Sequence, residues 1–163
     1  MQGKHNAQVA RAHYSFGDEA KFLQSINTAL EIAEQMRDNV MNLTSLDEIL
    51  CEQAAGYARL AKPEQALEIY QKTDKLRPFR PLREQGSYTL EKALAYLYMG
   101  ELNRGIEYAI KGLQLASEYR SKRHIRRMDV TYNRLKLMPL GQDKRLNTLH
   151  DAIIAAQKKQ EAW

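Results

Sequence analysis

Histidine, cysteine and acidic side chains are the groups from which metal sites and catalytic centres are built, and this sequence of 163 residues offers them in few useful combinations. None of its four histidines lies at a metal-binding spacing from acidic or cysteine partners. These histidines are His5, His13, His124 and His150. The sequence also lacks a glycine-rich phosphate loop and a nucleophile-elbow motif. The residues therefore predict a protein that is not an enzyme and that holds no metal or other cofactor.

Two further candidates for catalysis have simpler interpretations. No pattern around Cys51 supplies an activating partner, so we interpret it as a small residue on a helix face. Glu48 and Glu52 lie one helical turn apart, where carboxylates are usually solvated. A single cysteine excludes an internal disulfide and fits a reducing compartment. Because no run approaches the ~18 apolar residues of a membrane span and the N-terminus has no apolar core, we expect a cytoplasmic protein.

Arginine is the other residue type with a clear chemical use, because a guanidinium group binds carboxylates and phosphates. At 100° per residue, four arginines share one side of a helix and oppose its apolar residues. We call these four the basic stripe: Arg120, Arg123, Arg127 and Arg134. The stripe can contact nucleic acid or an acidic partner, but it has no recognition-helix turn and no interleaved aromatic residues. A solvated face, or salt bridges to a neighbouring helix, is the favoured interpretation.

The elements that position these side chains are helices, since apolar residues recur three and four apart along nearly the whole chain. The periodicity predicts eight helices, near 4–15, 19–37, 46–60, 63–75, 87–99, 102–118, 121–137 and 142–160. Ser45–Glu48 resembles a capping box that opens the third, and Pro63 suits the first turn of the fourth. The short connections predict antiparallel hairpins.

The hairpins repeat along the chain. Segments centred on Gly17, Ala61 and Gly100 align with one another, and a weaker fourth copy turns at Gly141. The turns lie roughly 40 residues apart, and a period of 20–50 residues is typical of solenoids. A single helical hairpin cannot bury its apolar face alone, so the copies are expected to stack.

The second copy carries a spaced set of small and aromatic residues that resembles the tetratricopeptide repeat. This set is Ala54, Tyr57, Ala61, Ala66, Tyr70, Thr73 and Pro78. The resemblance implies an all-α fold, a right-handed superhelix of about four antiparallel hairpins in one domain over 1–163, with repeats near 4–40, 44–80, 86–119 and 120–160. Glycine inside a helix costs ~1 kcal/mol relative to alanine, so the presence of Gly105 and Gly112 indicates a packing requirement. A close crossing of two helices would supply that requirement. The period exceeds the usual ~34 residues, and Phe22 stands where a small residue belongs. An unrelated helical bundle is the alternative.

In tetratricopeptide proteins the first helix of each hairpin lines a concave groove that holds extended peptides. Carried over by resemblance, that groove would be lined by Ala7, Arg11, Tyr14, Ser15, Cys51, Ala55, Arg59, Leu94, Leu97 and Tyr98. We favour Arg11 and Arg59 for capture of a carboxylate, with a solvent-facing arginine as the equal alternative. The Lys and Asn clamp of chaperone adaptors is not reproduced, so that role is not predicted.

The resulting expectation is a non-catalytic scaffold that binds a protein or peptide. The stretch from Gly100 to His124 also resembles the tail of bacterial helix-turn-helix regulators, in which such repeats sense a ligand or mediate self-association. We therefore expect the C-terminal part of a longer transcriptional regulator. The alternatives are a nucleic-acid-associated protein that uses the basic stripe, and a structural module that forms a homodimer. The net charge of +5 weakly favours anionic partners.

Overall fold

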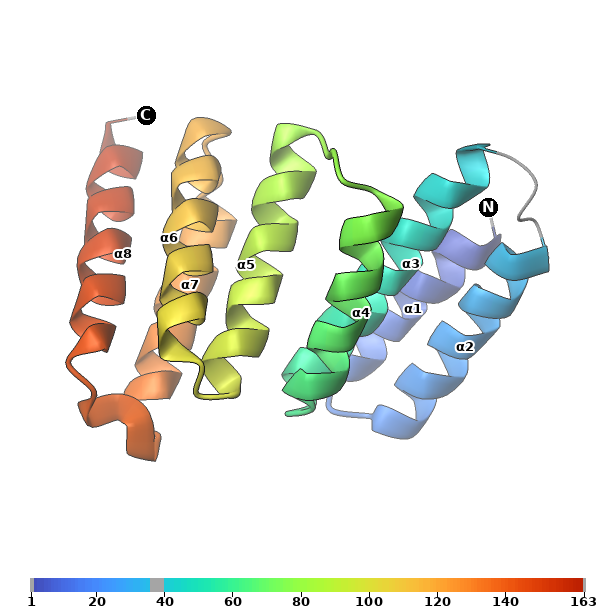
Figure 1. The fold of residues 1–163 in the computed structure, drawn as a ribbon, viewed down its shortest axis with the longest axis horizontal. Helices are drawn as coiled ribbons and strands as arrows, with labels where there is room; N and C mark the ends of the chain where they lie inside the picture. The colour runs from blue at the N-terminus through green and yellow to red at the C-terminus, as the bar shows by residue number, and fades with distance from the viewer. Residues whose placement is uncertain (1, 36–39, 163) are drawn as a thin grey trace. The chain divides into compact units, whose positions relative to one another are not determined.

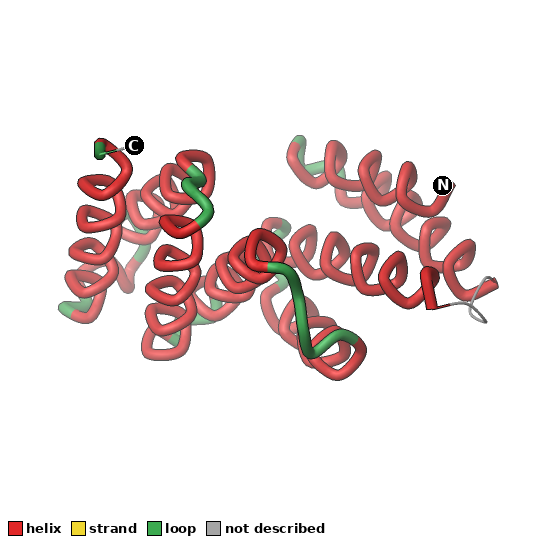
Figure 2. Tube along the Cα trace, turned by 90° about the horizontal axis from the view of Figure 1, so that it is seen from above, coloured by secondary structure: helices red, strands yellow, loops and turns green. Residues whose placement is uncertain are grey.

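The computed structural model describes the backbone of residues 2–35 and 40–162, with the side chains of these ranges except 2–4, 14–15 and 40–45. Over those residues the chain folds into eight α-helices and no strand (Figures 1 and 2). The helices are α1 (Gln2–Ser15), α2 (Glu19–Gln35), α3 (Val40–Arg59), α4 (Pro63–Leu76), α5 (Leu82–Tyr98), α6 (Leu102–Glu118), α7 (Lys122–Lys136) and α8 (Arg145–Glu161). A short 3-10 helix, Pro139–Gln142, precedes α8. The all-α class predicted from the periodicity is confirmed.

Three helices begin three or more residues from their predicted starts, and one of them is α5, which begins at Leu82 rather than near 87. Helix α3 begins at Val40, so Ser45–Glu48 lies inside it and is not its capping box. The sequence over 40–48 contains no glycine or proline, so nothing there interrupts a helix that has begun earlier. Helix α8 begins at Arg145 rather than near 142, because the preceding residues form the 3-10 helix. Asp143 Oδ1 then accepts a hydrogen bond from the Arg145 backbone N–H at 2.9 Å.

The three turns that align in sequence also share a backbone geometry. Gly17, Ala61 and Gly100 have φ angles of 74°, 58° and 79°, in the left-handed region. After each of them, the next residue donates its backbone N–H to the carbonyl five residues earlier, as in a Schellman helix end. Gly141, the predicted fourth turn, belongs to the 3-10 helix and does not share this geometry, which recurs instead at Arg120, with φ 53°, in the connection between α6 and α7. The predicted equivalence of the first three turns is confirmed, and the predicted fourth is corrected.

Replacing Ala61 with glycine is expected to raise the free energy of unfolding by about 0.5–1 kcal/mol. An L-residue pays ~1–2 kcal/mol in the left-handed region, and the greater freedom of glycine in the unfolded chain offsets part of that gain. Ala61 is exposed, so no packing is lost. Urea unfolding followed by far-UV circular dichroism measures the change. As a control, Ala20→Gly at an exposed position in the first turn of α2 should lower stability, by less than the ~1 kcal/mol that glycine costs in a helix interior. Equal effects of the two substitutions would contradict the prediction.

The chain divides into two compact units, Met1–Pro78 and Phe79–Trp163, whereas the sequence predicted one domain over 1–163. The boundary lies close to residue 80, where the sequence analysis ends the second repeat. Pro78 and Pro81 flank it, and proline cannot donate a backbone hydrogen bond or continue a helix without strain. Each unit contains two helical hairpins, and we describe each unit by itself.

Unit 1 (Met1–Pro78) packs α1 against α2, and α3 against α1, α2 and α4. Phe22 is fully buried in its core, and its ring meets the ring of Tyr57 edge to face at a centroid distance of 5.8 Å. The large side chain that departs from the tetratricopeptide pattern is therefore accommodated by an aromatic pair. The buried cluster around it consists of Ala7, Ala10, Phe22, Ile26, Ala29, Ala33 and Ile49.

Unit 2 (Phe79–Trp163) is centred on α6, which contacts α5, α7 and α8 (Figure 1). Two glycines of α6 allow α5 to approach it closely. A Cβ at Gly105 would lie 2.7 Å from Leu97 Cγ, and a Cβ at Gly112 would lie 2.6 Å from Leu90 Cγ. Both leucines are buried, so neither can move aside freely. The prediction that these glycines serve a close helix crossing is confirmed.

Candidate binding groove

The predicted groove residues of unit 1 are largely engaged within the unit. The guanidinium of Arg11 donates two hydrogen bonds to the carboxylate of Glu52, one of them from Nε to Oε2 at 2.9 Å, and so connects α1 to α3. Ala55 is only 4% exposed. Arg59 is exposed, and the side chain of Tyr14 lies outside the described residues. Arg11, favoured in the sequence analysis for capture of a partner's carboxylate, binds a carboxylate of its own chain.

The predicted groove residues of unit 2 belong mainly to its core. Leu94 is 4% exposed, and Tyr98 is half-buried against the hydrophobic cluster. Of the remaining positions carried over by resemblance, Ala7 and Leu97 are buried, Cys51 is half-buried, and the side chain of Ser15 lies outside the described residues. Periodicity marks the helix faces that repeat, but it does not show whether such a face meets solvent or a neighbouring helix.

The basic stripe is divided between two environments. Arg127 forms a bidentate pair with Glu91, in which its two terminal nitrogens bind the two carboxylate oxygens and connect α7 to α5. Arg120 occupies the turn before α7, and Arg123 and Arg134 are exposed. One of the four arginines therefore forms an interhelical salt bridge, which was part of the favoured interpretation in the sequence analysis.

A small hydrogen-bonded cluster fixes the start of α7. His124 Nδ1 lies 2.8 Å from Ser121 Oγ and 3.0 Å from Tyr119 Oη, and Ser121 Oγ caps the helix by accepting from the His124 backbone N–H. Tyr119 also packs on α5, where a Cβ at Gly86 would lie 2.6 Å from its hydroxyl. Burial lowers the pKa of His124 below its ordinary value of 6.5, and the positive charge of Arg127 adds to this effect. His124 is therefore neutral near pH 7.

The protein should lose stability as the pH falls from about 7 to about 5, in part through His124. Because the pKa of His124 is lower in the folded chain than in the unfolded chain, the unfolded state binds the proton more readily. The stability that this histidine contributes is present above pH 6.5 and is lost as the pH falls through its lowered pKa. Urea unfolding at both pH values measures the loss. In His124→Asn the loss should be smaller, and identical pH profiles for the variant and the wild type would refute the assignment.

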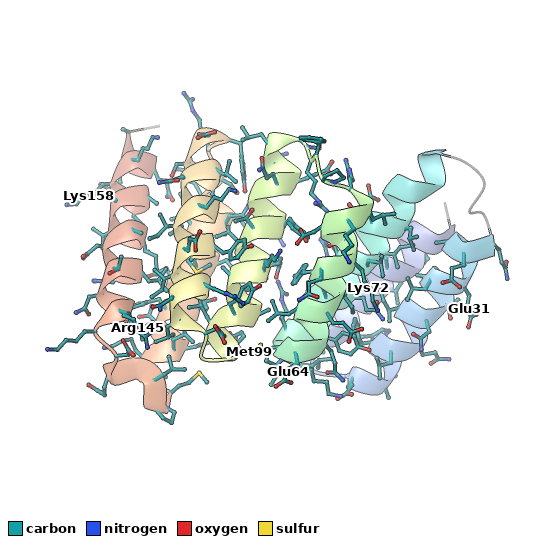
Figure 3. The ribbon with its side chains drawn as sticks, viewed as in Figure 1. Glu31, Glu64, Lys72, Met99, Arg145 and Lys158 are labelled. Carbon is teal, nitrogen blue, oxygen red and sulfur yellow. The ribbon has the colours of Figure 1, made fainter. Side chains whose placement is uncertain are left out.

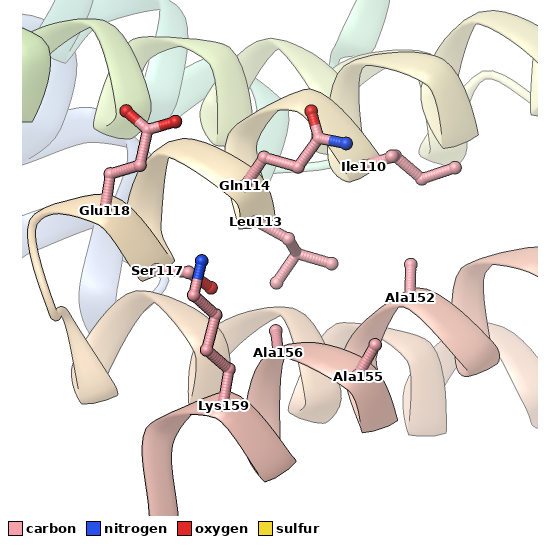
Figure 4. A pocket seen from close by; sticks show the side chains of 9 residues that line it. All are labelled: Ile110, Leu113, Gln114, Ser117, Glu118, Ala152, Ala155, Ala156 and Lys159. Carbon is pink, nitrogen blue, oxygen red and sulfur yellow. The ribbon is translucent and has the colours of Figure 1, made fainter. Parts of the chain in front are cut away.

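A groove lies between α6 and α8 in unit 2 (Figure 4). Its cavity measures about 440 Å³, within the range of sites that hold a ligand or an inserted side chain. The lining residues are Ile110, Leu113, Gln114, Ser117 and Glu118 of α6, and Ala152, Ala155, Ala156 and Lys159 of α8. Each set repeats at intervals of three and four, so each helix presents one face to the groove. Because alanine side chains end at Cβ, the three alanines leave space that larger residues would fill.

The chemistry of the groove changes along its length. Toward one end it is apolar, with Ile110 opposite Ala152 and the buried Leu113 between the helices (Figure 4). Toward the other end, Glu118 and Lys159 bring opposite charges. Among the described side chains, neither of these two forms a hydrogen bond or ion pair. The groove can therefore bury apolar side chains of a ligand and pair with both an acidic and a basic group.

Sequence reasoning did not find this groove, although a pattern for it exists. Ala152, Ala155 and Ala156 form a row of small residues at helical spacing in a helix whose buried residues are mostly large. The partner row on α6 lies about forty residues earlier, and only the fold brings the two rows together. Lys158, the neighbour of Lys159 on α8, is exposed and projects away from the helix (Figure 3).

A second feature that the sequence analysis missed is a series of aromatic and cationic side chains on α5 and α6. Tyr88, Lys92 and Tyr96 are spaced four apart on α5, and the Tyr96 ring stacks on Tyr108 of α6 at 5.4 Å. The Lys92 ammonium lies 5.1 Å from the centre of the Tyr108 ring and 5.8 Å from that of Tyr88. Lys92 is only 6% exposed, so these cation–π contacts stabilise a largely desolvated charge.

The described part of the chain shows no group of three or more His, Cys, Asp or Glu side chains placed to hold a metal ion. Within the same residues, no helix combines the length and apolar character that crossing a membrane requires. Neither a protein-family model nor a curated protein matches this sequence. The candidate site is therefore argued from its geometry alone.

Proposed function

We propose that this chain is a non-catalytic scaffold that binds a segment of another protein or a peptide, and that the groove between α6 and α8 is a binding site. The observation that carries the proposal is the groove itself, a cavity of about 440 Å³ with an apolar end and a charged end. A cavity lined by one face of each of two helices can hold a row of side chains from an extended or helical peptide segment.

We also propose that the hairpins stack as they do in tetratricopeptide arrays. Contacts within each unit support this arrangement, since α3 packs on both helices of the first hairpin, and α7 packs on both α5 and α6. The left-handed turns at Gly17, Ala61 and Gly100 support it further, because each closes an antiparallel hairpin in the same way. A right-handed superhelix over the whole chain remains part of this proposal.

The experiment is a selection of short random peptides on the immobilised chain, followed by affinity measurements with Ala155→Arg. Ala155 is an exposed residue of the groove, and an arginine there would occupy the cavity. We expect selected peptides to lose at least about tenfold in affinity, or about 1.4 kcal/mol. Ala20→Arg, the same substitution at an exposed position of α2, is the matched control. Peptides that bind Ala155→Arg as tightly as they bind the wild type would overturn the proposal.

We propose a role as the sensor or oligomerisation part of a bacterial transcriptional regulator on resemblance alone. The coding sequence upstream would test it directly, because a helix-turn-helix domain there is the expected result. The homodimer alternative predicts a solution mass of two chains and crosslinks through residues 4–37. The nucleic-acid alternative predicts binding that weakens steeply with salt and that is lost when the stripe residues Arg120, Arg123 and Arg134 become glutamate. Arg127 is left unchanged in this test because it pairs with Glu91.

A further inference from the structure

A row of exposed side chains runs along α7 opposite its buried residues. We call this row the α7 face: Lys122, Arg123, Arg126, Val130, Arg134 and Leu137. At 100° per residue these positions span ~120° of the helix surface. Val130 is 44% exposed and Leu137 is 88% exposed, so the α7 face combines cations with uncovered apolar surface. The α7 face therefore offers a partner two apolar side chains among four cations.

A second cavity opens beside the α7 face, between the start of α7 and the end of α8. It measures about 370 Å³ and is lined by Lys122, Ile125, Arg126, Gln157 and Gln160. Ile125 is fully buried and forms its floor. The aliphatic stems of Lys122 and Arg126 can form walls, while their charged ends and the two amides reach solvent. The cavity can therefore take one apolar side chain next to groups that bind carboxylates.

The net positive charge of the chain comes from its C-terminal hairpin, which consists of α7 and α8. Residues 119–163 contain eleven arginines and lysines and four acidic residues, which gives this segment a net charge of +7. The chain as a whole has a net charge of +5, so the rest of the chain is slightly negative. Helix α7 has six arginines and lysines and a single acidic residue, Asp129. Among the side chains that the structure describes, Lys122, Arg123 and Arg126 form no hydrogen bond or ion pair. Arg127, by contrast, is neutralised by Glu91.

We propose that the α7 face and its cavity bind an acidic segment of a partner protein, with an apolar side chain of that segment seated in the cavity. Charge complementarity selects the acidic character of the partner. The exposed Val130 and the floor at Ile125 select an apolar anchor, which a phosphate backbone does not offer. Nucleic acid is less suited to this surface, since no aromatic residue of the α7 face is available for base stacking. This surface shares no lining residue with the groove between α6 and α8.

The test uses fluorescently labelled synthetic peptides of glutamate and aspartate that differ only at a central leucine or serine. Fluorescence anisotropy at low and physiological salt measures their affinity for the full chain. We expect the leucine peptide to bind about tenfold more tightly, since burying one leucine side chain contributes at least that factor. Lys122→Glu together with Arg126→Glu should reduce its affinity at least about tenfold. Val130→Ser should shrink the advantage of leucine over serine.

Matched controls distinguish binding at the α7 face from nonspecific attraction by positive charge and from binding in the groove between α6 and α8. Lys75→Glu together with Lys111→Glu makes the same change in net charge at exposed residues outside the α7 face, and it should leave the leucine peptide bound. Ala155→Arg should also leave it bound, so failure here is distinguishable from failure of the proposed function. Equal affinity for the two peptides, or equal losses in both charge-reversal pairs, would overturn the proposal. Tighter binding of a DNA duplex than of the leucine peptide would overturn it in favour of nucleic acid.

Discussion

Replacing Gly141 with alanine is expected to lower the free energy of unfolding by about 3 kcal/mol, because the added methyl group meets backbone that cannot move aside. A Cβ at this position would contact the Lys136 carbonyl group, with its carbon only 2.7 Å away. Hydrogen bonds to its N–H and to its carbonyl also fix the backbone of Gly141. The Gly141 N–H donates to the Met138 carbonyl, and the Lys136 ammonium donates to the Gly141 carbonyl, each at 2.8 Å. Relief of the clash would break the turn that directs the chain into α8.

Urea unfolding of the full chain measures this effect, and Gly100→Ala is the matched control. A Cβ at Gly100 would meet nothing within 4 Å, so alanine there pays only for its left-handed backbone, ~1–2 kcal/mol, and its smaller freedom in the unfolded chain offsets part of that cost. Gly141→Ala should therefore be clearly the more destabilising of the two variants. The reverse order would show that the turn before α8 can relax and that the crowding at Gly141 does not constrain it.

Alanine in place of Gly112 should lower the free energy of unfolding by about 2 kcal/mol, although alanine is the better helix former by ~1 kcal/mol. The new Cβ would lie 2.6 Å from Leu90 Cγ and 3.3 Å from the Leu90 backbone nitrogen, in a fully packed crossing of α5 and α6. The leucine is 2% exposed, so its movement would displace other core side chains. The packing term therefore outweighs the gain in helix propensity.

A double-mutant cycle with Leu90→Ala tests the cause of this loss. Leu90→Ala alone should cost about 2–5 kcal/mol through the cavity it leaves. In the double variant the methyl group added by Gly112→Ala enters that cavity, so the combined loss should be smaller than the sum of the two separate losses, with a favourable coupling of about 1 kcal/mol. Strictly additive losses would mean that the destabilisation by Gly112→Ala has another origin. The groove between α6 and α8 depends on this crossing, because α6 supplies one of its walls.

Sequence and structure agree where the determining interactions are local. Helix periodicity, the small residues of the turns and the two glycines of α6 depend on backbone conformation and on neighbours within one hairpin. Ala61 shows this clearly. It adopts the left-handed backbone conformation that glycine adopts at the equivalent turns, because its place in the repeat requires that conformation. Ser45 shows a limit of local reasoning, because a pattern that can start a helix does not stop one that is already under way.

The sequence by itself determined the all-helical class, the positions of most helices and the three equivalent turns, because these follow from interactions between residues close together in the chain. Only the tertiary structure decided which surfaces are available to a partner. It paired Arg11 with Glu52 and Arg127 with Glu91, and it buried Ala55. It also formed the groove from two rows of residues about forty positions apart. Such contacts depend on how the helices pack against one another. The same helical periodicity is compatible with a face that is buried against another helix and with a face that is exposed to solvent.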